Sequence, residues 1–277
     1  MMMLNASHIC ATNFTYSHYR LNHCLDDIAA LGVQWFELWG VAPHLHIDTV
    51  QEADLQALRR ELAERELKLA CFTPEQCVYP VNIAAENPLQ REYSINYFRR
   101  SLEICESLES PLLFMTPGWG YEEDKPAEAR SRAVDALAQL AHLAESRGVT
   151  LVLEVLQPRE SNLASTVHEL ASLVNEVSSP ALDAALDIVG MAVGGDSVTD
   201  YLNAFGPKLR HCHFIDGTPA GHLALSDGNL PLKSYLSALR EGGYNGLLSL
   251  EIAGGRYWQE PLEPMRQSIT FLRDALA

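Results

Sequence analysis

Along the whole chain, short apolar segments rich in β-branched and aromatic residues alternate with longer segments of helical period. Eight such pairs follow one another, and a length of 277 residues gives each pair roughly 35 residues. Strands separated by helices run parallel, because the helix returns the chain to the edge of the sheet where the previous strand began. This alternation restricts the fold more than any other feature, and it predicts a parallel sheet covered by helices.

Turn residues bound the strand candidates, and apolar residues recur at i, i+3 and i+4 in the helix candidates. Gly32, Gly148 and Gly243 each follow a helix candidate, where a left-handed C-terminal cap is expected. The expected strands are 7–12, 34–39, 68–73, 111–116, 150–155, 182–187, 209–215 and 246–252. The expected helices are 21–31, 51–66, 89–108, 126–147, 166–177, 198–205, 231–240 and 261–276.

Two architectures accommodate this alternation, a closed barrel and an open doubly wound sheet. The open sheet usually has a glycine-rich turn after its first strand, and residues 13–19 (NFTYSHY) contain no glycine. Eight units and the total length fit the barrel, and no proline- or serine-rich linker divides the chain. We predict an α/β fold, a (β/α)8 TIM barrel, in which residues 1–277 form a single domain.

Acidic residues outnumber basic ones, with 36 Asp and Glu against 20 Lys and Arg and a net charge of −16. Nucleic acids and anionic membranes are bound largely through cationic side chains, so we expect neither as a partner. No run approaches the ~18 apolar residues of a membrane span, and the first residues lack the pattern of a signal peptide. The six cysteines are scattered without a CxxC pair, as expected for reduced core residues. We expect a soluble, cytoplasmic protein.

Metal-capable side chains stand at the carboxyl ends of four expected strands: Glu154, Asp187, His213 and Glu251. In a barrel these ends form the mouth, where active sites lie. Side chains alternate across a strand, so Leu153 faces the helices and Glu154 faces the mouth. The same parity directs Glu251 inward, and it places His213 on the inner face of its strand.

Three carboxylates ~5 Å apart repel one another by roughly 3 kcal/mol per pair at an effective dielectric constant of ~20. Three such pairs cost on the order of 10 kcal/mol, which is comparable to the stability of a whole domain. A divalent cation removes this penalty, and two Glu, one Asp and one His form a hard, oxygen-rich donor set. We predict one divalent metal ion, with Mn²⁺ as the first choice and Mg²⁺, Co²⁺, Ni²⁺ and Zn²⁺ as alternatives.

Other side chains near the strand ends are candidates for contacts with a small molecule. Trp39 and His44 follow the second expected strand and could wall a pocket. Trp119 and Trp258 lie in expected mouth loops, where an aromatic ring can stack on the apolar face of a sugar. We treat Trp39, His44 and Trp119 as candidate substrate-binding residues; Trp39 and His44 fit equally well as a core aromatic residue and a solvated loop histidine.

Some residues carry weaker signals. Glu37 shares a strand face with Trp39, and His211 shares one with His213, but parity alone assigns them no role. His18 is expected to be an ordinary surface or packing residue. The aromatic residues of the helix at 89–108 are expected to serve packing or a subunit interface.

Short motifs recur in order on the expected strands: FELWG (36–40), TPE (73–75), LEVLQPRESN (153–162), LDI (186–188), PKLRHCHFID (207–216) and SLEI (249–252). They resemble the motifs of the xylose-isomerase-like barrels, the sugar phosphate isomerase/epimerase family that includes D-tagatose 3-epimerase. The resemblance covers nearly the whole chain. Within this family, the chain is most similar to the fructoselysine 3-epimerases.

The resemblance implies a divalent metal ion on the same four residues, with the two glutamates also acting as the acid/base pair. It further implies that Glu160 contacts sugar oxygens and that His222 holds a substrate-binding position of the fructoselysine type. Two positions depart from the tagatose type. Gly190 stands where that type has a histidine three residues after the metal Asp, and residues 217–222 lack its arginine. Both departures argue against free D-tagatose or D-fructose as the substrate.

We therefore expect a divalent-metal-dependent epimerase acting at C3 of a ketose or a fructoselysine-like ketosamine. Glu154 and Glu251 would exchange the C3 proton through an enediolate held by the metal. Another sugar isomerase or lyase of the family, such as hydroxypyruvate isomerase or inosose dehydratase, is the alternative. AP endonucleases of the superfamily need further His and Asp ligands that segment AGH (220–222) does not supply. A sugar-binding protein without activity would not need bases on two faces. The expected partners are a small sugar or sugar-amine and, because relatives assemble, other copies of the same chain in a homo-oligomer.

Overall fold

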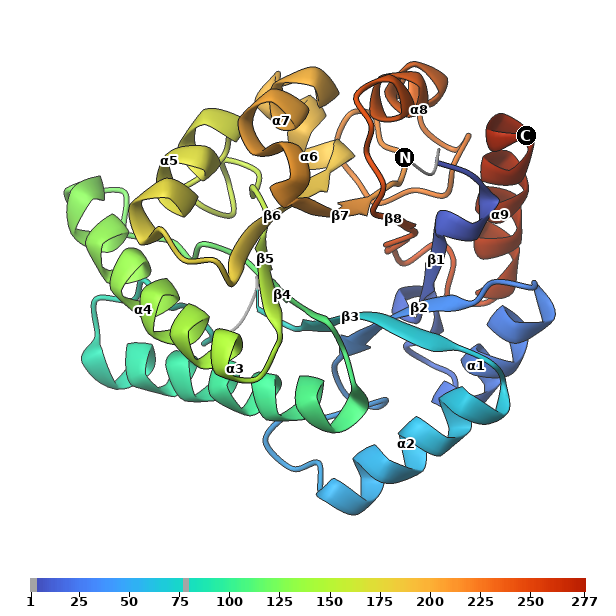
Figure 1. Cartoon of the computed structure of the whole chain (residues 1–277), viewed down its shortest axis with the longest axis horizontal. Coiled ribbons are helices and arrows are strands. Elements are labelled where there is room, and N and C mark those ends of the chain that lie inside the picture. The colour runs from blue at the N-terminus through green and yellow to red at the C-terminus, as the bar shows by residue number, and fades with distance from the viewer. Residues whose placement is uncertain (1–3, 77–79) are drawn as a thin grey trace.

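Eight parallel strands pair in the order of the chain, and β8 pairs with β1 to close the barrel (Figure 1). The computed structural model describes residues 4–76 and 80–277. The closed barrel with helices between its strands confirms the predicted fold. The strands are β1 (Ile9–Thr12), β2 (Trp35–Gly40), β3 (Lys68–Pro74), β4 (Leu112–Met115), β5 (Thr150–Leu153), β6 (Leu182–Asp187), β7 (Leu209–His213) and β8 (Leu247–Ser249).

A ring of helices surrounds the strands (Figure 1). They are α1 (Leu21–Ala30), α2 (Glu52–Glu64), α3 (Pro88–Leu108), α4 (Pro126–Ser146), α5 (Val167–Val177), α6 (Ile188–Gly194), α7 (Val198–Phe205), α8 (Leu232–Glu241) and α9 (Leu262–Leu276). Short 3₁₀ helices lie beside β1 and β7: η1 (Ala6–His8), η2 (Phe14–Tyr16) and η3 (Gly206–Lys208).

The helix boundaries follow local capping chemistry. The Asn87 side chain accepts hydrogen bonds from the backbone N–H groups of Leu89 and Gln90, with Pro88 at the first position of α3. Thr166 and Glu169 form a reciprocal capping box at the start of α5. Gly32, Gly148 and Gly243 have φ values of 68°, 67° and 74°, which confirms the expected left-handed residues after the helices.

Several boundaries differ from the sequence expectation. β5 ends at Leu153 and β8 at Ser249, so Glu154 and Glu251 lie in the loops that directly follow these strands. The segment after β6 contains the short helix α6, which the sequence pattern did not predict. The missed signal is Asp187, whose side chain accepts the N–H of Gly190 and caps α6 as the strand ends.

The core has two layers, as expected for this architecture. The larger layer lies between strands and helices and includes Leu151, Leu153 and Leu248. A smaller cluster, containing Val152 and Phe114, fills the inside of the barrel. The alternation predicted for β5 is therefore confirmed, and it directs the residue after Leu153 toward the mouth.

The five cysteines that the structure describes are buried and form no disulfide: Cys10, Cys24, Cys71, Cys105 and Cys212. Cys77 and Tyr79 lie outside the described residues. Among the helices of the described chain, none is both long and apolar enough to cross a membrane.

Candidate active site

Glu154, Asp187, His213 and Glu251 converge at the carboxyl end of the barrel. Nδ1 of His213 lies 2.8 Å from Oε2 of Glu251, 3.9 Å from Oδ2 of Asp187 and 4.0 Å from Oε2 of Glu154. Donor atoms of Glu154, Asp187 and His213 all lie within 4.8 Å of one another. Two residues at the ends of β6 and β7, and two in the loops after β5 and β8, therefore surround one small volume.

Strand register explains this convergence. Asp187 at the end of β6 pairs with His213 at the end of β7, and His213 pairs with Ser249 of β8. Glu251 follows Ser249 by two residues and so lies on the same inward face. Asp187 accepts the N–H of Gly190 through Oδ1 at 2.6 Å, and its Oδ2 is the oxygen directed toward His213.

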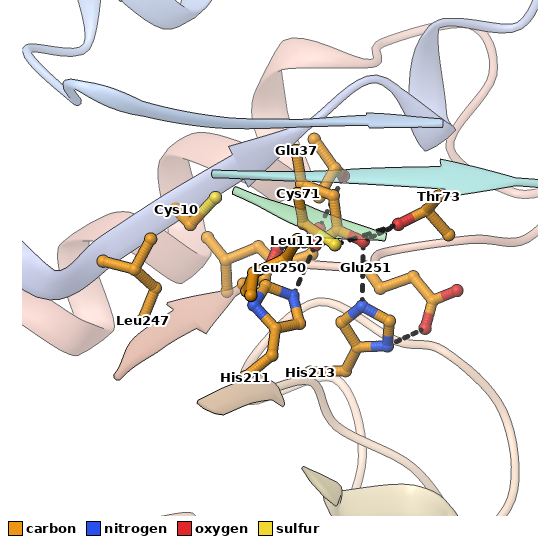
Figure 2. Close-up of polar contacts among 12 residues, drawn as sticks. Cys10, Glu37, Cys71, Thr73, Leu112, His211, His213, Leu247, Leu250 and Glu251 are labelled. Atoms are coloured by element: carbon orange, nitrogen blue, oxygen red, sulfur yellow. Dashed lines mark hydrogen bonds and ion pairs between the residues drawn. The ribbon is translucent and has the colours of Figure 1, made fainter. Parts of the chain in front are cut away.

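A buried carboxylate lies on the other side of His213. Glu37 of β2 is fully buried and contacts Nε2 of His213 at 3.0 Å and Nε2 of His211 at 2.8 Å. It also accepts hydrogen bonds from Thr73 and Ser249. Figure 2 shows Glu37 and Glu251 on opposite sides of the His213 ring.

Burial and the neighbouring charges shift the pKa values of Glu154 and His213. Burial raises the pKa of Glu154 well above its usual value; His213 opposes this effect, while Asp187 and Glu251 reinforce it. Burial alone would lower the pKa of His213, but the negative charges of Glu251 and Glu37 outweigh it and raise this pKa well above 6.5.

In Glu251 and Glu37, neighbouring histidines outweigh the effect of burial on the pKa. Burial would raise the pKa of Glu251, but the charges of His213 and His222 hold it below its usual value. Burial would also raise the pKa of Glu37, and the two histidines that contact it outweigh this effect and keep the pKa well below the usual range. Burial raises the pKa of Glu154 and also that of Asp187, so a neighbouring positive charge would stabilise the ionised form of both.

The donor set fits a divalent cation. Nδ1 of His213 is buried, and three carboxylates lie within 4.0 Å of it, the nearest being that of Glu251 at 2.8 Å. His222 approaches from the β7–α8 loop, and its donor atom lies within 4.8 Å of donor atoms of Asp187 and Glu251. One imidazole and three carboxylates suit Mn²⁺, Mg²⁺ and related ions better than a soft metal.

The cluster forms the floor of a cavity of about 490 Å³, a size typical of sites for small molecules. The loops after β1, β3, β5 and β8 supply much of its wall. Trp39 stacks on Phe14 with ring centroids 4.6 Å apart, and its indole Nε1–H donates to Oε2 of Glu75 at 3.0 Å. Trp258 and His18 lie together on another part of the wall, with ring centroids 5.4 Å apart.

Three of the expected substrate contacts, Glu160, His222 and Trp39, line this cavity. His44 does not: its Nδ1 lies 2.7 Å from Nδ2 of Asn13, and its Nε2 lies 2.9 Å from the carbonyl oxygen of Tyr19. Asn13 in turn bonds both backbone polar groups of Trp39. The structure thus makes His44 a support for the aromatic wall and not part of it.

Trp119 also lies outside the cavity lining. Its backbone bonds to Asn82 in both directions, and its ring contacts Tyr121 with centroids 5.6 Å apart. The β4–α4 loop carries it to a separate surface pocket beside Arg132. The sequence placed Trp119 in a loop at the mouth of the barrel, but it did not determine the direction in which the side chain points.

Other residues of the site were not assigned by sequence reasoning. Glu75, Gln76 and His18 line the cavity. Glu75 belongs to the TPE motif, so a signal existed without a role attached to it. For Glu37, the only signal in the sequence was its position on the same strand face as Trp39. In the structure, both residues lie on the inward face of β2.

A family model for xylose isomerase-like TIM barrels matches residues 25–275. The chain belongs to this family. It is 26% identical over 267 residues to fructoselysine 3-epimerase of Escherichia coli O157:H7, covering 95% of this chain and 97% of that protein. It is 24% identical over 233 residues to D-psicose 3-epimerase of Agrobacterium fabrum, covering 82% of this chain and 77% of that protein.

A solved structure of the IOLI protein with a bound zinc atom superimposes with a TM-score of 0.80 at 20% identity, covering 97% of this chain and 98% of that one. The chain is an enzyme of the isomerase class, as its sugar 3-epimerase relatives indicate. The resemblance seen in the sequence motifs is confirmed.

Gly190 lines the cavity where the tagatose type was expected to carry a histidine. A Cβ atom at this position would lie 3.1 Å from Cγ2 of Val155, so a larger side chain needs Val155 to move. A ligand in this part of the cavity would therefore contact residues other than Gly190.

Proposed function

We propose that the protein is a divalent-metal-dependent epimerase that inverts C3 of a ketose or an amine-linked ketose. The single observation that carries this proposal is the arrangement of Glu154 and Glu251. They follow β5 and β8, and the two intervening strands supply Asp187 and His213. A substrate bound at the cation site has one glutamate on each side.

Inversion at C3 requires removal of a proton from one face and its return to the other. When bound, a divalent cation polarises the substrate oxygens and increases the acidity of the C3 hydrogen. One of the two glutamates takes the proton from C3, and the other donates a proton to the opposite face. In the reverse reaction, Glu154 and Glu251 exchange these roles.

The cavity walls favour a neutral or cationic substrate. Among the lining residues that the structure describes, none is lysine or arginine. Five are carboxylic acids: Glu75, Glu154, Glu160, Asp187 and Glu251. A phosphorylated sugar or a substrate carboxylate would have no cationic side chain to bind it in this lining.

Glu75 and Glu160 belong to the wall and not to the four-residue cluster. An ammonium group on the distal part of a ketosamine can therefore pair with either of them, while the stacked rings of Phe14 and Trp39 cover the apolar part of the ligand. The relative named fructoselysine 3-epimerase supports the same substrate class. We propose Mn²⁺ as the physiological ion.

The decisive experiment incubates the Mn²⁺-loaded protein in deuterium oxide with fructoselysine, and separately with D-fructose and D-psicose. We expect deuterium at C3 of both epimers, with fructoselysine the fastest substrate. Exchange confined to C1 would indicate an aldose–ketose isomerase, and loss of water would indicate a dehydratase. Either result would contradict the proposal, as would unchanged substrate in all three reactions.

A further inference from the structure

We propose that Glu37 is a positioning residue that holds His213 in the tautomer whose Nδ1 atom can ligate the metal ion. This inference rests on the cation site of the proposed function, but not on the chemistry at C3. Glu37 lies on the strand opposite the four ligands, and its carboxylate is enclosed in the barrel below the cavity floor.

The hydrogen bonds of Glu37 use the whole carboxylate. Oε1 contacts Nε2 of His213 and the Thr73 hydroxyl, and Oε2 contacts Nε2 of His211 and the Ser249 hydroxyl. A carboxylate has about four acceptor positions and no donor, so these four groups saturate it. Figure 2 shows Thr73, His211 and His213 around Glu37. The partners come from β3, β7 and β8, which prevents the carboxylate from turning away from His213.

This geometry determines where the His213 ring carries its proton. With Nε2 at 3.0 Å from a carboxylate oxygen, an N–H on Nε2 is attractive, whereas a bare Nε2 would set one lone pair against another. A neutral ring with its proton on Nε2 has a free lone pair on Nδ1. Nδ1 is the buried atom that faces Glu154, Asp187 and Glu251, and a cation bound there would lie between its lone pair and the carboxylate oxygens.

The alternation of β2 supports this role. Phe36 and Leu38 pack in the layer between strands and helices, so Glu37 lies on the opposite, inward face of the strand together with Trp39. The register shift between β2 and β3 places its extra residue, Ala70, in β3 and leaves this alternation intact.

Histidine ligands commonly donate their second N–H to a carboxylate, and loss of that partner weakens metal binding by roughly 10- to 100-fold. We therefore expect Glu37→Gln to raise the dissociation constant for Co²⁺ by 10- to 100-fold in a direct titration of the metal-free protein. The d–d absorption of the Co²⁺ complex should also change, because the ring is no longer held in one orientation.

Asp183→Asn is the matched control. It removes the same charge from a barrel strand, but Asp183 lies at the amino end of β6 and its nearest cationic partner is Arg210 at 4.0 Å. The control should bind Co²⁺ within about twofold of the wild-type protein, with the same spectrum. Equal affinity and spectrum in the wild-type protein and folded Glu37→Gln would overturn the inference and leave the proposed function intact.

A second measurement needs no variant at Glu37. Nitrogen-15 spectra of the zinc-loaded wild-type protein, assigned by the signals lost in His213→Gln, report which ring nitrogen carries the proton. We expect a slowly exchanging proton on Nε2 and zinc on Nδ1. Zinc on Nε2 would overturn the role proposed for Glu37 and leave the proposed function intact. A wild-type protein that binds neither Co²⁺ nor zinc would overturn both the role of Glu37 and the proposed function.

Discussion

Nδ1 of His213 lies 2.8 Å from Oε2 of Glu251, so the atom best placed to ligate a cation already forms a close ion-pair contact in the protein. Protons and the cation compete for this position. Without the ion, the pKa of His213 is raised well above 6.5 by Glu251 and Glu37, despite the opposing effect of burial. The pKa of Glu154 is raised well above 4.5, chiefly by burial.

These shifts predict how metal binding depends on pH. Both groups bind protons more tightly in the folded protein, so the stability of the metal-free protein falls as pH rises from 4.5 toward the folded pKa of Glu154 and from 6.5 toward that of His213. The metal displaces these protons and removes that loss. The increase in Tm caused by saturating Mn²⁺ over a chelator should be larger at pH 8 than at pH 6. An increase that is equal at both pH values, or larger at pH 6, would contradict this prediction.

Substituting either glutamate separates the two half-reactions. Glu154→Gln and Glu251→Gln should each lower epimerisation by at least about 10³-fold, because one face of C3 loses its base. Each variant should still exchange deuterium into one C3 epimer, and the two variants should select opposite epimers. Nuclear magnetic resonance of each pure epimer in deuterium oxide measures this. Near-normal turnover in either metal-loaded variant would exclude the two-base mechanism.

Much of the fold could be predicted because its signals are local and periodic. β6 and α7 lie where the sequence pattern placed them, since their apolar periods and flanking residues are unambiguous. The four residues of the cluster were found because strand parity and the carboxyl-end rule act together. Each of these arguments needs only a short stretch of sequence and the symmetry of the barrel.

The roles of the other site residues depend on contacts between segments that lie far apart in the sequence. Glu37 is separated from His213 by 176 positions, and only the closed barrel brings them together. His44 and Trp119 occupy loops whose side-chain directions are set by Asn13 and Asn82. The expected homo-oligomer and the single-domain boundaries stay predictions.

Glu75 and Glu160 in the cavity wall predict that the enzyme prefers substrates with a positive charge. Glu75→Gln should raise KM for an amine-linked ketose by roughly 3- to 10-fold, because one unit charge near a half-exposed site contributes about 1 kcal/mol. KM for the neutral sugar D-psicose should change by less than about twofold. Glu86→Gln, an exposed acid outside the cavity lining, serves as the control. Steady-state kinetics with both substrates test this, and an equal rise in KM for both would show that Glu75 acts only through Trp39.

The loop that carries His222 depends on one buried carboxylate. Asp216 is 1% exposed and accepts four backbone N–H groups, from Gly217, Ser226, Gly228 and Leu230, at 2.8–3.1 Å. Asp216→Ala leaves these donors without their partner, and we expect it to lower the free energy of unfolding in urea by about 3 kcal/mol. Because the same loop places His222 beside Asp187 and Glu251, kcat/KM should fall by at least about tenfold in the protein that remains folded.

Ser197→Ala gives the comparison for this last prediction. It removes the exposed cap of α7, where the Ser197 hydroxyl accepts the N–H of Asp200, and it should cost about 1 kcal/mol without changing kcat/KM. A loss from Asp216→Ala no greater than that from the cap would mean that the backbone donors find other partners. The position of His222 would then depend on its carbonyl contact with the Ala253 N–H at 3.0 Å, and not on the Asp216 carboxylate.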